Sequence, residues 1–240
     1  MAGLYSAVLF LSSALLFSLQ IMFARMLLPQ LGGSPAVWNT CMLFYQSVLL
    51  AGYGYVHAMS KMPVRRMAVV HLCLLLAGAV FLPVRLIGSV GGDWVAYPIL
   101  ETLGVLAASI GAPLLVLSAN SVMMQKWFAS SGHADARDPY FLYRAGNAGS
   151  LAALLTYPFF VEPNMGLKMQ SMYWSAGYGA LAVMGLMCIR FVRNSPSLSE
   201  SEIPAADSIA EGDPISRRLH WTVLSFVPCS MMLGVTSYFS

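Results

Sequence analysis

Residues 1–24 read MAGLYSAVLFLSSALLFSLQIMFA and contain no charged side chain. An α-helix rises about 1.5 Å per residue, so roughly 20 apolar residues cross the ~30 Å hydrocarbon layer of a bilayer. No basic segment precedes this run, and it is longer than the apolar core of a signal peptide. We therefore predict a membrane-spanning helix here rather than a cleaved leader.

The rest of the chain repeats this pattern. Of its 240 residues, 58% are hydrophobic and 10% are charged, which excludes a water-soluble globular domain. Charge-free runs near the spanning length occur in seven places, and we predict an all-α, polytopic membrane helix bundle of about seven transmembrane helices. These runs cover 1–24, 26–60, 67–84, 102–125, 145–161, 169–189 and 219–240.

Proline, glycine and charged residues suggest where the helices end. We expect the first helix to stop at Pro29 and the fourth to kink at Pro113. Residues 193–218 are rich in Ser, Pro, Glu and Asp and predict a polar, disordered linker. A six-helix bundle (1–192) would precede it, and a seventh, incomplete helix (219–240) would follow. The six helices are expected at about 4–28, 38–57, 67–87, 100–128, 140–160 and 168–192.

Basic residues occur mainly in alternate connections between the predicted helices. Lysine and arginine in short loops mark the cytoplasmic side of a membrane protein. The connections after the second, fourth and sixth predicted helices are the basic ones. We therefore predict that the N-terminus and the 193–218 linker are cytoplasmic. The residues concerned are Lys61, Arg65, Arg66, Lys126, Arg137, Arg190, Arg193, Arg217 and Arg218.

Polar side chains at membrane depth are the candidate functional residues, because they are costly to place in lipid. Four amides, Gln20, Gln46, Asn120 and Asn147, lie deep in predicted helices, and we expect them to line a substrate path if the chain transports a solute. The alternative is that they hold helices together through hydrogen bonds worth about 0.6 kcal/mol each.

Three charged residues are candidates for a gate or for contact with lipid headgroups. Arg25 lies one turn before Pro29 and can extend to the outer headgroups. Glu101 begins a predicted helix, where a carboxylate suits the positive end of the helix dipole. Arg144 lies in the first turns of the fifth helix, where it can reach phosphate headgroups.

Other features predict packing. Ala145, Gly149 and Ala153 recur every four residues and predict a close helix–helix seam. His71 lies alone in an apolar run, which favours a neutral, hydrogen-bonded side chain over a metal ligand. Five aromatic residues near helix ends fit an interfacial belt: Trp38, Tyr97, Trp127, Tyr140 and Trp221.

Signatures of catalysis, metal binding and nucleic-acid binding are not found. The four cysteines show no C-x-x-C spacing, so we expect neither a disulfide framework nor a zinc site. The G-x-G-x-x-A match at 177–182 lies within an apolar helix rather than after a strand, which argues against a dinucleotide site. The net charge of +3 comes without a basic patch suited to nucleic acid. We expect no cofactor.

The predicted plan of six helices, a cytoplasmic linker and a further helix is that of the first half of a major-facilitator-type bundle. Four stretches also resemble the membrane region of bacterial fused proteins that join a major-facilitator-like bundle to a spermidine-synthase-like domain. They are LLPQLGGSPAVWNTCMLFYQSVLLAGYGYVH (27–57), DPYFLYRAGNAGSLAALLTYPFFVEPNMGL (138–167), WSAGYG (174–179) and FVPCSMMLGVTSYFS (226–240).

The resemblance implies a bacterial inner-membrane bundle followed by an aminopropyltransferase-like domain that uses decarboxylated S-adenosylmethionine and a polyamine. The glycine-rich and acidic motifs of such a domain are not in this chain, so no catalytic residue carries over and we expect no enzyme activity from it.

We therefore expect a multi-pass, transporter-like protein in the lipid bilayer that moves or channels a small, polyamine-like solute. A synthase-like domain or a second membrane subunit would be its partner. The alternatives are a non-transporting anchor or assembly subunit for another protein, and a truncated gene product without activity of its own.

Overall fold

The computed structural model describes residues 1–31, 34–88, 98–131, 133–137 and 140–194, together with 219–220, 222–224, 226–227 and 230–231. It divides into two compact units, Met1–Pro196 and Ser197–Ser240. Within these described residues every regular element is helical, which confirms the all-α class. The predicted linker lies almost entirely outside the described residues, and the parts of 219–231 that are described are helical.

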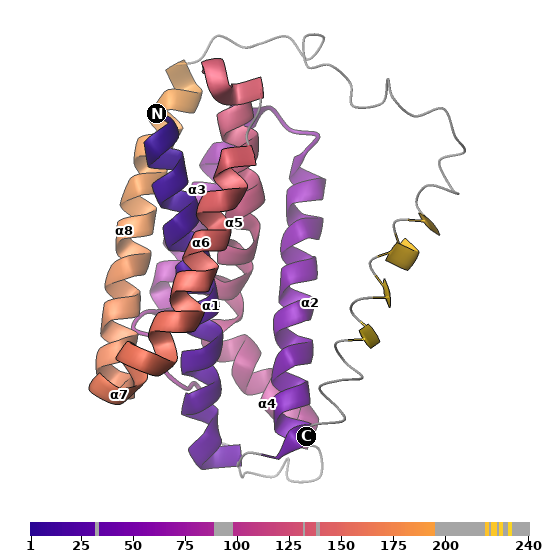
Figure 1. The fold of residues 1–240 in the computed structure, drawn as a ribbon, viewed down its shortest axis with the longest axis vertical. Helices are drawn as coiled ribbons and strands as arrows, with labels where there is room; N and C mark the ends of the chain where they lie inside the picture. Colours follow the sequence, from indigo (N-terminus) through magenta and orange to yellow (C-terminus); the bar gives the residue numbers. More distant parts are fainter. Residues whose placement is uncertain are drawn as a thin grey trace. The chain divides into compact units, whose positions relative to one another are not determined.

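The first unit is a bundle whose long helices run lengthwise (Figure 1), and we group its elements into six passes. Helices α1, α2 and α8 are uninterrupted, and the other three passes combine shorter helical pieces. The passes are α1 (Ala2–Leu31); α2 (Pro35–Met59); α3 (Val64–Gly78) with the 3₁₀ turn η1 (Ala79–Phe81); α4 (Pro98–Leu106), η2 (Ala107–Gly111) and α5 (Ala112–Ala129); α6 (Tyr140–Thr156), η4 (Tyr157–Val161) and α7 (Glu162–Asn164); and α8 (Leu167–Asn194). A 3₁₀ turn, η3 (Ala134–Arg137), lies between α5 and α6.

Two passes contain a segment of π-helix, and each is associated with a proline. A proline has no N–H and cannot bond the carbonyl four residues before it. Segment η2 ends two residues before Pro113, and Pro158 lies inside η4. The irregularity predicted at Pro113 therefore takes the form of a wider turn immediately before it.

Two predicted helix ends are wrong. Helix α1 continues through Pro29 to Leu31, and since only two residues follow Pro29, the hydrogen bond that proline cannot make is lost at the end of the helix rather than in its interior. The third pass ends at Phe81 rather than at residue 87. Pro83 follows, and a proline disfavours the helical conformation of the residue before it.

The number of membrane spans also needs correction. In the part of the chain that the structure describes, four helices rather than seven are long and apolar enough to cross a membrane. Helix α2 carries Asn39 and Gln46 among its apolar residues, and α6 is only 17 residues long and contains Arg144 and Asn147. The four candidate spans are Ala2–Leu31, Val64–Phe81, Ile99–Ala129 and Leu167–Phe191.

Helix α1 lies at the centre of the bundle and packs against α2, α5, α6 and α8. Its contact with α6 depends on Gly149, where a Cβ atom would overlap the carbonyl oxygen of Phe10. Both Gly149 and Ala153 are buried, which confirms the predicted small-residue seam.

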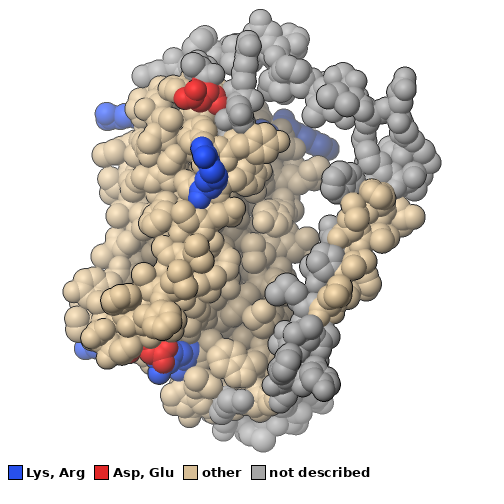
Figure 2. Space-filling view, in the orientation of Figure 1, with Lys and Arg blue, Asp and Glu red and all other residues tan. Residues whose placement is uncertain are grey.

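The passes alternate in direction, so their ends form two groups. The Tyr5 hydroxyl donates to the Cys188 carbonyl (3.5 Å), and the Lys126 ammonium donates to the Ser60 carbonyl (3.2 Å). The start of α1 therefore lies beside the end of α8, and the end of α5 beside the α2–α3 connection. We call this the Lys126 end and the opposite one the Glu162 end. On the face shown in Figure 2, charged side chains gather mainly near these two ends, and uncharged surface lies between them.

Candidate functional site

Polar side chains inside the bundle form two clusters. The first, the His71 cluster, comprises Tyr55 of α2, His71 of α3, and Asn120 and Trp127 of α5. His71 Nε2 lies 3.2 Å from Asn120 Oδ1, and both residues are only 1% exposed. The His71 ring stacks on Tyr55 (centroids 6.1 Å apart) and meets Trp127 edge to face (5.9 Å). The cluster thus joins three helices through one histidine.

Each member of the His71 cluster has a buried polar atom that lacks a hydrogen-bond partner among the described residues. These atoms are Tyr55 Oη, His71 Nδ1, Asn120 Nδ2 and Trp127 Nε1. Phenol, amide and indole groups all donate hydrogen bonds. Three of the four atoms, on Tyr55, Asn120 and Trp127, therefore belong to donor groups that have no acceptor among the described residues.

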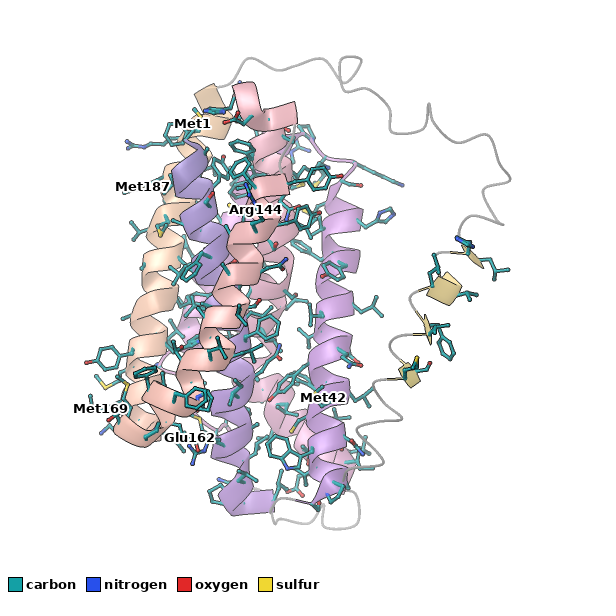
Figure 3. All side chains as sticks on the ribbon, in the orientation of Figure 1. Met1, Met42, Arg144, Glu162, Met169 and Met187 are labelled. Carbon is teal, nitrogen blue, oxygen red and sulfur yellow. The ribbon has the colours of Figure 1, made fainter. Side chains whose placement is uncertain are left out.

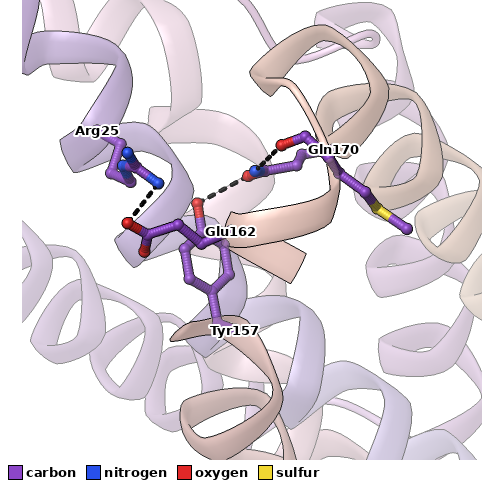
Figure 4. Close-up of polar contacts among 5 residues, drawn as sticks. Arg25, Tyr157, Glu162 and Gln170 are labelled. Carbon is purple, nitrogen blue, oxygen red and sulfur yellow. Dashed lines mark hydrogen bonds and ion pairs between the residues drawn. The ribbon is translucent and has the colours of Figure 1, made fainter. Parts of the chain in front are cut away.

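The second, the Glu162 cluster, lies toward the other end of the bundle and is fully paired (Figure 4). Arg25 of α1 forms an ion pair with Glu162 of α7, with 2.7 Å between Nη1 and Oε1. The Tyr157 hydroxyl donates to Gln170 Oε1 (2.7 Å), and Gln170 Nε2 donates to the carbonyl of Met165 (2.8 Å). Three passes are joined here. Tyr157 lies in the π segment η4, and Glu162 comes directly after it.

The structure does not gather the four amides predicted to line a path. Asn120 is buried against His71, and Gln20 is half-buried on α1, where its backbone carbonyl accepts the Tyr45 hydroxyl (3.1 Å). Gln46 of α2 and Asn147 of α6 are exposed on the outer surface of the bundle.

The three predicted charged residues have different surroundings. Arg25, which was predicted to reach headgroups or act in a gate, forms an ion pair with Glu162. Glu101 lies in the first turn of α4, as its helix-dipole role requires. Arg144 is exposed on α6, one helical turn before Asn147 (Figure 3).

Sequence reasoning missed Tyr157, Glu162 and Gln170 as members of a polar cluster. The available signal was that Arg25 and Glu162 carry opposite charges and lie near predicted helix ends on the same side of the membrane. The prediction that Trp127 belongs to an interfacial belt is also wrong, because this side chain is fully buried. Trp38 and Tyr140 are exposed, and Tyr97 and Trp221 lie outside the described residues.

Metal ligands are not brought together in the described residues, where no group of three or more His, Cys, Asp and Glu side chains could hold an ion. The three cysteines described there, Cys41, Cys73 and Cys188, are free.

Comparisons of the chain with protein-family models, with curated proteins and with solved structures gave no match.

Proposed function

We propose that this chain is an integral membrane protein, the transporter-like membrane region of a larger assembly, and that the exposed polar face of α6 borders a path for a small solute. That face consists of Arg144 and Asn147. The observation that carries the proposal is their exposure on a bundle whose outer surface is otherwise largely apolar.

The apolar exterior supports the membrane location. Large hydrophobic side chains are exposed on every pass, including Leu50 of α2, Val80 of η1 and Phe159 of η4. Water disfavours contiguous apolar surface of this extent, whereas lipid tails accommodate it. Four helices have the length and apolar composition to span the bilayer, and they form the framework of the bundle.

The polar face of α6 interrupts this exterior. Asn147 lies about 10 Å along the helix from Tyr140, its first residue. Leu151, Leu154 and Leu155 are exposed further along the same helix and suit lipid. Polar and charged groups at membrane depth normally face a water-filled space or another protein element. We therefore assign this face to an aqueous path, with a second membrane subunit or a synthase-like domain completing it.

The kind of solute follows from the family resemblance rather than from the bundle. A polyamine-like solute would need carboxylates along its route. The acidic side chains described in the bundle are Glu101, Asp135 and Glu162, and Glu162 is already paired with Arg25. The polyamine-like identity rests on the resemblance, and what the structure contributes to the proposal is the exposed polar face of α6.

Thiol labelling in membranes tests the aqueous path. In a chain whose four native cysteines are replaced by alanine, Asn147→Cys is compared with Leu151→Cys, an exposed apolar position on the same helix. A membrane-impermeant maleimide should label the first at least about tenfold faster, because only a hydrated thiol ionises to the reactive thiolate. Equal, slow labelling of both in native membranes and in detergent would overturn the proposal. Labelling of Asn147→Cys in detergent with protection in native membranes would identify a covering partner.

Flux measurements test the transport step separately. The purified chain is reconstituted into vesicles, and uptake of radiolabelled spermidine is compared between the wild type and Asn147→Ala. We expect reduced flux in the variant. Unchanged flux with unchanged folding would remove Asn147 from the path.

An anchor or assembly subunit is the second candidate. The small-residue face of α6 is already used within the chain, because Gly149 packs on Phe10. An exposed apolar surface that could meet a partner is the face of α2 that includes Trp38, Leu43 and Tyr53. Photo-crosslinking from Leu43 in native membranes would support this function if it captured one consistent protein and no flux were measurable.

A further inference from the structure

A pocket of about 480 Å³ opens at the Glu162 end of the bundle. It lies between α1, the segment 82–88 that follows η1, and the start of α8. Met26, Leu86 and Met172 are among its apolar walls, and Arg85 and Lys168 lie at its edge. Its size falls within the range of about 300–1,000 Å³ that is common for small-molecule sites.

Hydrogen bonds fix the walls of this pocket. The Ser171 hydroxyl of α8 donates to the Val84 carbonyl (2.5 Å), and both residues are buried. The Ile87 N–H donates to the Ser109 hydroxyl of η2 (2.8 Å). Segment 82–88 is thereby attached to α8 and to the fourth pass, so the pocket is part of the packed bundle.

Charge at the pocket edge is unbalanced. Arg25 is neutralised by Glu162, whereas Arg85 and Lys168 have no ion-pair partner within the described residues and are exposed. Two cations beside an apolar hollow match a molecule with an anionic head and an apolar tail. A small soluble anion would use the cations but would leave the apolar walls unfilled.

We propose that this pocket binds an anionic phospholipid, with its phosphate between Arg85 and Lys168 and part of one acyl chain along Met26, Leu86 and Met172. The proposal rests on the membrane location proposed above, because that location places the pocket at the height of the lipid headgroups. Basic residues between membrane helices are a recurring means of holding such lipids.

Thermal unfolding of the purified full chain in detergent tests the proposal, with phosphatidylglycerol, phosphatidylcholine or inorganic phosphate added. We expect phosphatidylglycerol to raise the melting temperature more than the other two. In the double variant Arg85→Gln, Lys168→Gln, the phosphatidylglycerol concentration that gives half the shift should rise at least about tenfold. The control is Arg66→Gln, Arg190→Gln, which removes the same charge from exposed residues outside the pocket.

A second variant, Leu86→Trp, fills the apolar part and leaves both cations in place. It should also lose the phosphatidylglycerol response while keeping its helical circular dichroism. An equal response to phosphatidylcholine, an equal response to inorganic phosphate, or equal losses in the pocket and control variants would each overturn the proposal. Membrane location is measured separately, by carbonate extraction of native membranes, so failure of the lipid site is distinguishable from failure of the proposed function.

Discussion

The His71 cluster and the Glu162 cluster each join three passes of one bundle, but they differ in how their polar atoms are satisfied. In the first, two polar side chains share one hydrogen bond in the core, and four buried atoms lack a partner among the described residues. In the second, two hydrogen bonds and an ion pair connect neighbouring elements, and the ion-pair side chains are 38% and 39% exposed. A buried polar group that is left unpaired costs much free energy, whereas breaking an exposed ion pair costs little.

The comparison predicts that the largest effect will come from the His71 cluster. Replacing Asn120 with alanine removes the partner of His71 Nε2 and leaves a cavity around a buried imidazole. We expect a loss of about 2–3 kcal/mol in the free energy of unfolding. The measurement is reversible unfolding by SDS titration in mixed micelles, with circular dichroism as the readout.

Two controls accompany this measurement. Asn147→Ala changes an exposed amide on α6 and should alter stability by less than about 0.5 kcal/mol. The double variant His71→Phe, Asn120→Leu removes both partners with similar shapes and should lose less than Asn120→Ala alone. A larger loss in the double variant would mean that the polar pair itself stabilises the core.

A smaller effect is expected from Gln170. This buried side chain accepts from Tyr157 and donates to the Met165 carbonyl, so Gln170→Ala breaks two hydrogen bonds. We expect a loss of about 1–2 kcal/mol, measured in the same titration. Tyr157→Phe removes only one of the bonds and should cost about half as much. Equal costs for the two variants would show that the bond to Met165 contributes nothing.

The sequence predicted the all-α class, because apolar runs are a local property of the chain. It did not predict the π segments, although Pro113 and Pro158 mark both of them. The prediction that the first helix stops at Pro29 is wrong, because α1 includes two more residues and ends at Leu31.

The polar clusters were harder to predict, because they depend on which helices are neighbours. Asn120 and His71 are each recognisable as polar residues in apolar runs, but they are 49 residues apart and meet only through the packing of α3 on α5. The same packing buries Trp127, whose position near the end of a helix suggested an interface. Glu162 meets Arg25 because the first and fifth passes end side by side, which composition cannot show.

The smallest effect is predicted for the Arg25–Glu162 ion pair. Both side chains are more than one third exposed, so water and salt screen their attraction. A double-mutant cycle of Arg25→Gln and Glu162→Gln should give a coupling energy of about 0.2–1 kcal/mol at low salt, and less at 1 M salt. A coupling that exceeds the Asn120→Ala loss, or that does not change with salt, would contradict the comparison. It would show that the pair is shielded from water in the membrane, and the Glu162 cluster would then be the stronger connection of the two.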